Sequence, residues 1–169
     1  IRSLLNQGGM GAVYKGFDTT LQREVAIKVM HAHFAQEPNF RDRFLLEART
    51  AARLDHPGIV KVFDFGEHEG LLYIVMEYLA GDNLFQKLEQ TKQKREWLPI
   101  YEAVEIGRQV AAALDYAHQQ GVLHRDIKPA NIMLKPETSG SLPYRAVMTD
   151  LGLARLVSGQ NLTQEGSSV

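Results

Sequence analysis

The sequence predicts an α+β fold in which a small antiparallel sheet with one helix precedes the start of a mainly helical lobe. Short segments rich in Val, Ile, Tyr and Phe alternate with turn residues up to about residue 78. A helical pattern of apolar residues interrupts them at 38–54, and helical patterns dominate 81–120. We therefore expect one lobe at 1–79 and a second, partial lobe at 80–169. Ligand clefts often form at such boundaries.

Four strands and one helix are expected in the first lobe. Segments 12–17 and 24–30 favour a hairpin, and segments 59–65 and 71–78 favour a second pair joined by a polar turn. The helix at 38–54 has apolar residues at three- and four-residue steps, a proline in its first turn, and a Pro-Gly pair after its end.

The second lobe is expected to contain helices over 81–120 with an exposed charged connection at 90–96. Pro99 suits a helix start and Gly121 a helix stop. Short strands are expected at 122–123, 132–134 and 147–149, and 135–145 should form a long loop. One face of the second helix should be formed by Ala103, Ile106, Val110, Ala113 and Ala117.

Composition excludes several classes of protein. The 169 residues contain no cysteine, which excludes disulfides, cysteine-ligated zinc and thiol catalysis. A net charge of −1 gives no field that favours nucleic acid, and no apolar run approaches the roughly 20 residues of a membrane helix. No signal segment is present and the chain starts at Ile1 without an initiator Met. We expect a piece of a longer cytoplasmic protein, or of the cytoplasmic part of a membrane-anchored one.

A glycine-rich turn, Asn-Gln-Gly-Gly-Met-Gly, occupies residues 6–11 between two strand segments. Glycines let the backbone approach a phosphate and offer it N–H groups. The alternative is an ordinary hairpin turn. A Rossmann dinucleotide site is disfavoured, because the segment that follows looks like a strand and not a helix.

Lys28 and Glu47 are a candidate ion pair. Strand alternation places Lys28 on the same face as the small Ala26, although an edge-strand lysine facing solvent is the commoner case. Glu47 shares the apolar face of its helix, where an unpaired carboxylate is costly, so a cation such as Lys28 should accompany it. The alternative is a glutamate that reaches water at the edge of the stripe.

Two further motifs carry chemistry. The string His-Arg-Asp-Ile-Lys-Pro-Ala-Asn at 124–131 packs polar residues between two apolar runs, as in loops that hold catalytic groups, and a solvated turn is the alternative. Asp150 ends a strand segment and is followed by an apolar residue and glycine. Such a carboxylate can hold a hard cation, whereas an ordinary Asp-x-Gly turn is the alternative.

In this order the five motifs resemble the protein kinase family, and within it the bacterial serine/threonine kinases of eukaryotic type. The spacing of Lys28 to Glu47 and of Asp126 to Asn131 fits the family. The resemblance covers essentially the whole chain and implies a kinase-like fold that binds ATP and Mg²⁺ and phosphorylates Ser or Thr hydroxyls of protein substrates.

The resemblance also implies a role for each matching residue. Asp126 accepts or orients the hydroxyl proton, Lys128 touches the γ-phosphate, and Lys28 pairs with the α- and β-phosphates and with Glu47. Asn131 and Asp150 hold Mg²⁺. Asn131 completes the catalytic set. The nucleotide-binding set, in which the glycine turn covers the phosphates and the later residues surround the adenine, is Asn6, Gly8, Gly9, Gly11, Val13, Ala26, Lys28, Met76, Glu77, Leu79, Met133 and Asp150.

Regulation and lobe coupling follow from the same resemblance. Arg125 implies control by a phosphate on the following loop, at Thr163 first and otherwise at Ser167 or Ser168, which a kinase dimer could place by autophosphorylation. A stacked apolar spine is implied for Ala51, Val62, His124 and Leu151.

The sequence departs from the family pattern in three places. Asn6 replaces the first glycine of the turn, and Leu151 replaces the usual Phe. The chain stops at Val169 before an A-P-E motif, so we expect the 169 residues alone to be poorly stable and weakly active. A non-catalytic pseudokinase or scaffold is the main alternative, but it should lack Lys28, Asp126 or Asp150. A small-molecule kinase is disfavoured by the lysine-proline pair after Asp126.

Overall fold

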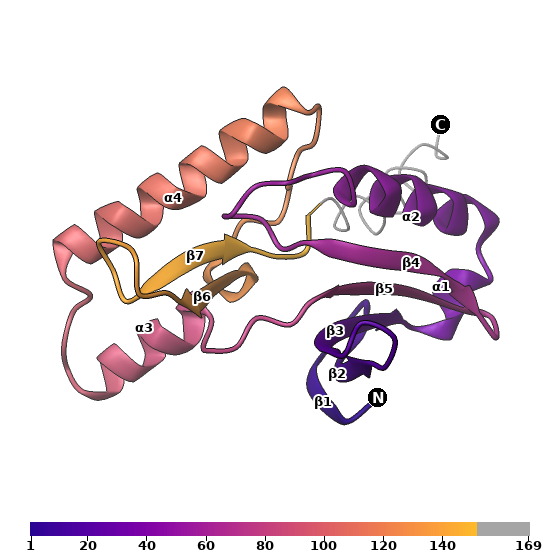
Figure 1. Cartoon of the computed structure of the whole chain (residues 1–169), viewed down its shortest axis with the longest axis horizontal. Helices are drawn as coiled ribbons and strands as arrows, with labels where there is room; N and C mark the ends of the chain where they lie inside the picture. Colours follow the sequence, from indigo (N-terminus) through magenta and orange to yellow (C-terminus); the bar gives the residue numbers. More distant parts are fainter. Residues whose placement is uncertain (152–169) are drawn as a thin grey trace, which may run out of the picture. The chain divides into compact units, whose positions relative to one another are not determined.

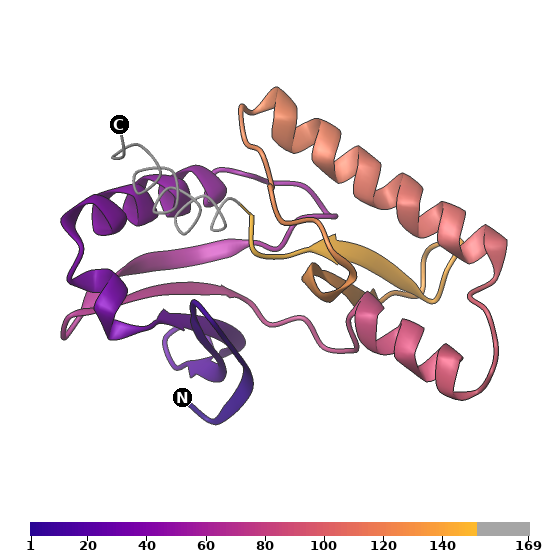
Figure 2. The same ribbon diagram turned by 180° about the vertical axis from the view of Figure 1, so that it is seen from behind.

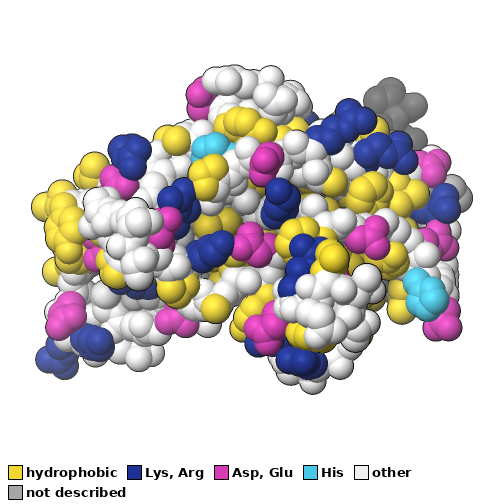
Figure 3. All heavy atoms as spheres, viewed as in Figure 1, with side chains coloured by type: hydrophobic (Ala, Val, Ile, Leu, Met, Phe, Trp, Pro, Cys, Tyr) yellow, Lys and Arg dark blue, Asp and Glu magenta, His cyan; other side chains and the backbone are white. Residues whose placement is uncertain are grey.

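The computed structural model describes residues 1–151 (Figure 1). Its contacts divide these residues into two compact units, 1–53 with 61–78 and 54–60 with 79–151. The candidate phosphorylation sites Thr163, Ser167 and Ser168 lie outside the described residues. None of the described helices is both long enough and apolar enough to span a bilayer. Basic and acidic side chains are interspersed on the face shown in Figure 3.

The first unit is built on a five-stranded antiparallel sheet in the order β1-β2-β3-β5-β4. The strands are β1 (Ser3–Gly8), β2 (Gly11–Asp18), β3 (Arg23–Met30), β4 (Val62–His68) and β5 (Leu71–Glu77). Both predicted hairpins are confirmed. The expected strand at 59–65 is displaced, because Ile59 bridges to Met148 and Val60 donates to the Met148 carbonyl in the second unit.

Helix α2 (Pro38–Ala51) confirms the predicted helix and packs against β4 (Figure 1). Its apolar stripe is fully buried at Phe40, Phe44 and Ala48. The helix ends three residues before the predicted Leu54, which lies in the core of the second unit. A four-residue helix, α1 (Ala32–Ala35), was not predicted, because a segment this short shows no helical period.

The second unit places two helices against a hairpin, as Figure 2 shows from behind. These are α3 (Leu84–Gln93) and α4 (Ile100–Gln119), with β6 (Ile132–Pro136) and β7 (Tyr144–Met148) as the hairpin and a 3₁₀ turn at Pro129–Asn131. The expected connection at 90–96 is partly wrong, because α3 continues to Gln93. The expected strand at 122–123 is wrong, and the loop expected at 135–145 is shorter because both strands extend into it.

The buried face of α4 differs from the prediction at one position. Ile106, Val110, Ala113 and Ala117 are buried as expected, but Ala103 is exposed and Glu102 takes its place at 8% exposure. Lys87 Nζ on α3 lies 2.8 Å from Glu102 Oε1, and the Tyr144 hydroxyl on β7 donates to the same oxygen. Burial by itself raises the pKa of Glu102, yet these two donors leave that pKa below its ordinary value.

Candidate active site

Lys28 lies on β3, the middle strand of the five, and is only 6% exposed. The edge-strand alternative is therefore wrong. Lys28 faces Val13 on β2 and Ile74 on β5, and Ala26 faces Met76 on β5. Cross-strand partners share a face of the sheet, so Val13, Ala26, Lys28 and Met76 lie on one face.

The glycine turn closes the β1–β2 hairpin, with Gly8 paired to Gly11. A Cβ on Gly11 would lie 2.0 Å from the Val29 carbonyl oxygen and its φ is +156°, so only glycine fits there. A Cβ on Gly8 or Gly9 would meet nothing within 4 Å. The sheet therefore demands Gly11, while Gly8 and Gly9 leave one side of the turn open. Asn6 accepts the Gln7 N–H at 2.8 Å at a bulge in β1.

Glu47 lies half-buried on α2, beside the fully buried Phe44 and Ala48. This position supports the argument that its carboxylate needs a cation. The pairing of Glu47 with Lys28 stays a prediction.

The segment at 124–131 and the end of β7 are joined by a closed ring of hydrogen bonds, defined by His124, Asp126, Asn131 and Thr149. His124 Nε2 lies 2.9 Å from the Thr149 carbonyl oxygen, and the Thr149 N–H donates to the Asn131 carbonyl at 2.9 Å. Asn131 Nδ2 donates to both the carbonyl and Oδ2 of Asp126, each at 2.9 Å, and the Asp126 N–H donates to His124 Nδ1 at 3.3 Å. The ring fixes Asp126 against the strand that precedes Asp150.

This ring also fixes the tautomer of His124. A backbone N–H can only donate and a carbonyl can only accept. Nδ1 is therefore the acceptor and Nε2 carries the proton. His124 is 2% exposed, so its imidazole is a buried hydrogen-bonded link between Asp126 and Thr149.

Asp126 is held as a partly exposed carboxylate beside His124. Lys128 Nζ lies 2.7 Å from Asp126 Oδ2, the oxygen that also accepts from Asn131. The hydrogen bond from Lys128 lowers the pKa of Asp126, partial burial raises it, and the hydrogen bond from Asn131 lowers it. The net result is a pKa of Asp126 below its ordinary value. The Asp126 side chain is 38% exposed, so it keeps an accessible edge.

Two residues of these loops have left-handed backbones: Arg125 with a φ of +65° and Asp150 with a φ of +61°. Non-glycine residues in this region cost roughly 1–2 kcal/mol each. Such conformations persist where the surroundings impose them and gather at functional sites. Here they stand next to Asp126 and directly after Thr149.

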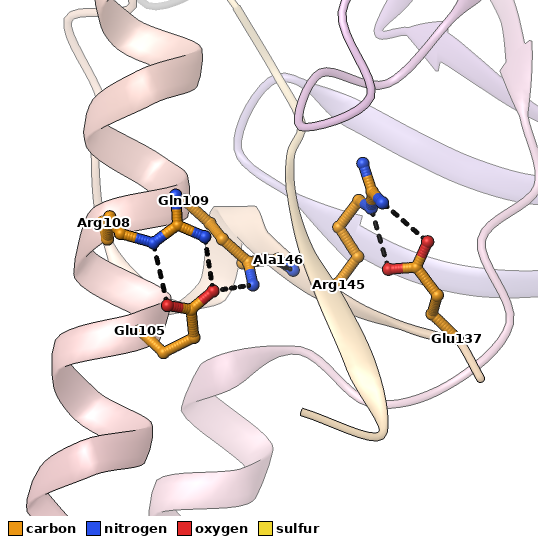
Figure 4. A network of polar contacts seen from close by, with 6 residues as sticks. All are labelled: Glu105, Arg108, Gln109, Glu137, Arg145 and Ala146. Carbon is orange, nitrogen blue, oxygen red and sulfur yellow. Dashed lines mark hydrogen bonds and ion pairs between the residues drawn. The ribbon is translucent and has the colours of Figure 1, made fainter. Parts of the chain in front are cut away.

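A polar network on α4 supports β7 (Figure 4). Gln109 accepts the Ala146 N–H at 2.8 Å and donates to Glu105 at 2.9 Å. Arg108 pairs with Glu105 through two contacts of 2.6 and 2.8 Å, and this pairing lowers the pKa of Glu105 to about 2. Sequence reasoning missed these residues, although a Glu, Arg and Gln at three- and four-residue steps on a helix are a signal for such a network.

The remaining predicted residues have mixed environments. Leu79, Met76 and Asn131 are buried, whereas Met133 and Glu77 are half-buried. The Glu77 N–H donates to the Lys61 carbonyl at 2.9 Å, so Glu77 can offer a base only its carbonyl.

The four residues of the implied apolar spine differ in their burial. Ala51, His124 and Leu151 are buried and Val62 is half-buried. Their stacking stays a prediction.

Among residues 1–151, no cluster of three or more His, Asp or Glu could hold a metal ion by itself. Asn131 and Asp150 are the predicted Mg²⁺ ligands, and their joint binding of the ion stays a prediction. The Asn131 amide nitrogen faces Asp126, which turns its oxygen away from that carboxylate. Mg²⁺ commonly binds through one or two side-chain oxygens together with phosphate oxygens, so this donor set fits Mg²⁺.

Comparison with known proteins identifies the family. The sequence profile described as "Protein kinase domain" matches residues 1–168. The chain belongs to the protein kinase family. Serine/threonine-protein kinase PknJ of Mycobacterium tuberculosis is 42% identical over 167 residues, which are 99% of this chain and 27% of PknJ. PknE of the same species is 40% identical over 169 residues, which are 100% of this chain and 28% of PknE.

Solved structures agree with the sequence relatives. The crystal structure of the M. tuberculosis PknI kinase domain matches this kinase chain with a TM-score of 0.75 and 40% identity, over 89% of this chain and 58% of PknI's. The predicted kinase-like α+β class is thereby confirmed. The chain spans about a quarter of the length of the two relatives named above.

Proposed function

We propose that this protein is a serine/threonine protein kinase that transfers the γ-phosphoryl group of ATP to Ser or Thr hydroxyls of other proteins. Residues 1–79 form its nucleotide-binding lobe and 80–169 the first part of its catalytic lobe. The ring that fixes Asp126 beside Lys128 and Asn131 carries the proposal. A scaffold would have no need to hold an accessible carboxylate between a lysine and an amide.

The reaction follows from the charges. Asp126 is ionised at neutral pH, so its carboxylate can accept a hydrogen bond from the acceptor hydroxyl and orient that oxygen toward the γ-phosphorus. Lys128, already beside Asp126, balances negative charge that develops on the transferred group. Lys28 pairs with the α- and β-phosphates, and Glu47 holds Lys28 in place.

The nucleotide-binding residues fall into an adenine set and a phosphate set. Val13, Ala26 and Met76, which share one face of the sheet, surround the adenine together with Met133. The carbonyl of Glu77 and the backbone of Leu79 meet the edge of the base. The glycine turn, in which Asn6 stands at the position of the first glycine, covers the phosphates with Gly8, Gly9 and Gly11.

Asn131 and Asp150 would hold Mg²⁺, which neutralises phosphate charge when bound. Asn131 belongs to the ring and Asp150 directly follows Thr149, which supports a position for both residues near Asp126.

Control of the kinase is proposed to act through Arg125. Its side chain is exposed and lies next to Asp126. A phosphate on Thr163, or on Ser167 or Ser168, would pair with this guanidinium and order the following loop, and a second kinase copy would transfer that phosphate from ATP. Because ATP is the phosphoryl donor, we place the protein in the cytoplasm.

The test compares two aspartates of the second unit. Asp126→Asn should lower phosphoryl transfer to a protein substrate by about 10²–10⁴-fold, because it removes the base while keeping the shape. Asp115→Asn changes an exposed aspartate on α4 that pairs with Gln119, and it should leave the rate unchanged. Transfer is measured with γ-labelled ATP in the full-length gene product. Equal rates for wild type and Asp126→Asn would overturn the assignment in favour of a non-catalytic module.

A further inference from the structure

We propose that His31 is a positioning residue for the nucleotide phosphates, because it clamps the glycine turn 8–11 from the side of α1. The inference rests on the proposed function and deepens it. It assigns a role to a histidine that none of the motifs includes.

His31 makes two hydrogen bonds to the turn. Its ring atom Nε2 lies 3.1 Å from the Gly8 carbonyl oxygen, and its backbone N–H donates to the Met10 carbonyl at 3.1 Å. Because a carbonyl only accepts, Nε2 must carry the proton. His31 therefore contacts the turn at both Gly8 and Met10.

The position of His31 makes this contact unusual. It is the residue before α1 and has the extended backbone of a helix cap, with φ −60° and ψ 142°. Its side chain does not cap α1; the ring crosses instead to Gly8, 23 residues earlier in the chain. The His31 carbonyl accepts the Phe34 N–H at 3.0 Å, so the backbone of His31 is also tied to α1.

The ring of His31 is connected to the core by a row of ring contacts, two stacked and one tilted. His31 and His33 stack with centroids 5.9 Å apart, and His33 lies 4.0 Å from Phe34. Phe34 stacks on Phe40 at 4.6 Å, and Phe40 is fully buried. These ring contacts connect the His31 imidazole to the buried Phe40 and so restrict its orientation.

The glycine turn needs such a support. Every residue of β1 is exposed, and nothing lies within 4 Å of the Cβ positions of Gly8 and Gly9. Glycine also loses more backbone freedom on ordering than any other residue. At Gly8 and Gly9 the turn therefore has little packing that would fix its peptide groups before a ligand arrives.

Clamping a carbonyl also orients an N–H group. In a trans peptide the C=O of one residue and the N–H of the next point in opposite directions. With the Gly8 carbonyl held toward His31, the Gly9 N–H points away from His31. The Met10 carbonyl fixes the peptide group of Gly11 in the same way. His31 thus pre-orients backbone donors of the kind that bind phosphate.

Two variants separate the clamp from a merely structural role. His31→Phe keeps a ring that can stack on His33 but has no donor. His31→Gln loses the ring and keeps an N–H donor. His68→Phe is the matched control, because His68 is an exposed histidine at the β4–β5 turn of the same unit.

Steady-state kinetics with ATP as the varied substrate are measured in the full-length gene product. Loss of one hydrogen bond predicts that His31→Phe raises KM for ATP about 3- to 10-fold while kcat stays within about twofold. His31→Gln should restore KM to within about twofold of wild type, and His68→Phe should match wild type. An unchanged KM in His31→Phe, or equal impairment in both His31 variants, would overturn the clamp.

A second measurement needs no nucleotide. Hydrogen exchange of the peptide that contains Gly9 should become about 3- to 10-fold faster in His31→Phe and not in His68→Phe. Unchanged exchange would contradict the clamp. If wild type transfers phosphate and only the His31 results fail, this inference alone is wrong. If wild type does not bind ATP, the proposed function fails and the role of His31 toward phosphates fails with it.

Discussion

Replacing Lys87 by Met should weaken the link between α3 and α4 far more than replacing Lys92, the other lysine of α3. The substitution removes the ammonium that lies 2.8 Å from Glu102. It leaves a carboxylate that is 10% exposed, with the Tyr144 hydroxyl as its remaining donor among residues 1–151. Hydrogen bonds to charged groups contribute about 1.5–3 kcal/mol. The Lys87 side chain is 27% exposed, which favours the lower half of that range, or about 2 kcal/mol.

The expected loss can be measured within these two helices. Amide hydrogen exchange of peptides from α3 and α4, followed by mass spectrometry, should be about 30-fold faster in Lys87→Met, since 1.4 kcal/mol is tenfold. Lys92→Met is the matched control, because Lys92 lies on the same helix with a 79% exposed side chain near Glu89. Exchange in Lys87→Met that is no faster than in Lys92→Met would refute the reasoning.

The effect should also depend on pH with a defined sign. The folded-state pKa of Glu102 lies below its ordinary 4.5, so its contribution to stability is present above that pH and is lost as pH falls through the lowered value. Without Lys87, burial dominates and raises the pKa of Glu102. The difference in exchange between wild type and Lys87→Met should therefore be largest at neutral pH and shrink below about pH 4.5.

Two further predictions concern the glycine turn and the Asp126 loop. Gly11→Ala should destabilise the first unit by about 3 kcal/mol or more, because its Cβ would lie 2.0 Å from the Val29 carbonyl oxygen. Gly9→Ala should cost less than about 1 kcal/mol. Urea unfolding followed by circular dichroism measures both, and similar midpoints for the two variants would contradict this prediction. Lys128→Met should lower kcat about 10²-fold and move the acidic limb of its pH profile to higher pH, because Lys128 lowers the pKa of Asp126; an unshifted limb would show that Lys128 does not act on Asp126.

Elements with a strong period were predictable from the sequence. The hairpins and α2 follow the alternation or helical spacing of their apolar residues, and Lys28 shares its face with Ala26 as that alternation requires. Strand β1 has no buried face, and α1 is barely one turn long, so neither leaves a pattern to detect.

The residue types of the candidate site were predictable, but the bonds that order them were not. The motif predicts that Asp126 and Asn131 act together, yet only the fold brings Thr149 to both His124 and Asn131. Glu102 was missed for a related reason. A carboxylate on a helix is expected in water, and its burial depends on Lys87 and Tyr144 from two other elements.

The ring of hydrogen bonds among His124, Asp126, Asn131 and Thr149 has a consequence for substitutions in these loops. Asp126 and Asp150 come from separate loops, but His124 and Asn131 connect those loops by hydrogen bonds to Thr149. The backbone that carries Asp126 is therefore held directly to Thr149, the residue before Asp150. A substitution that shifts the backbone at Asp126 should therefore also shift the backbone that leads into Asp150.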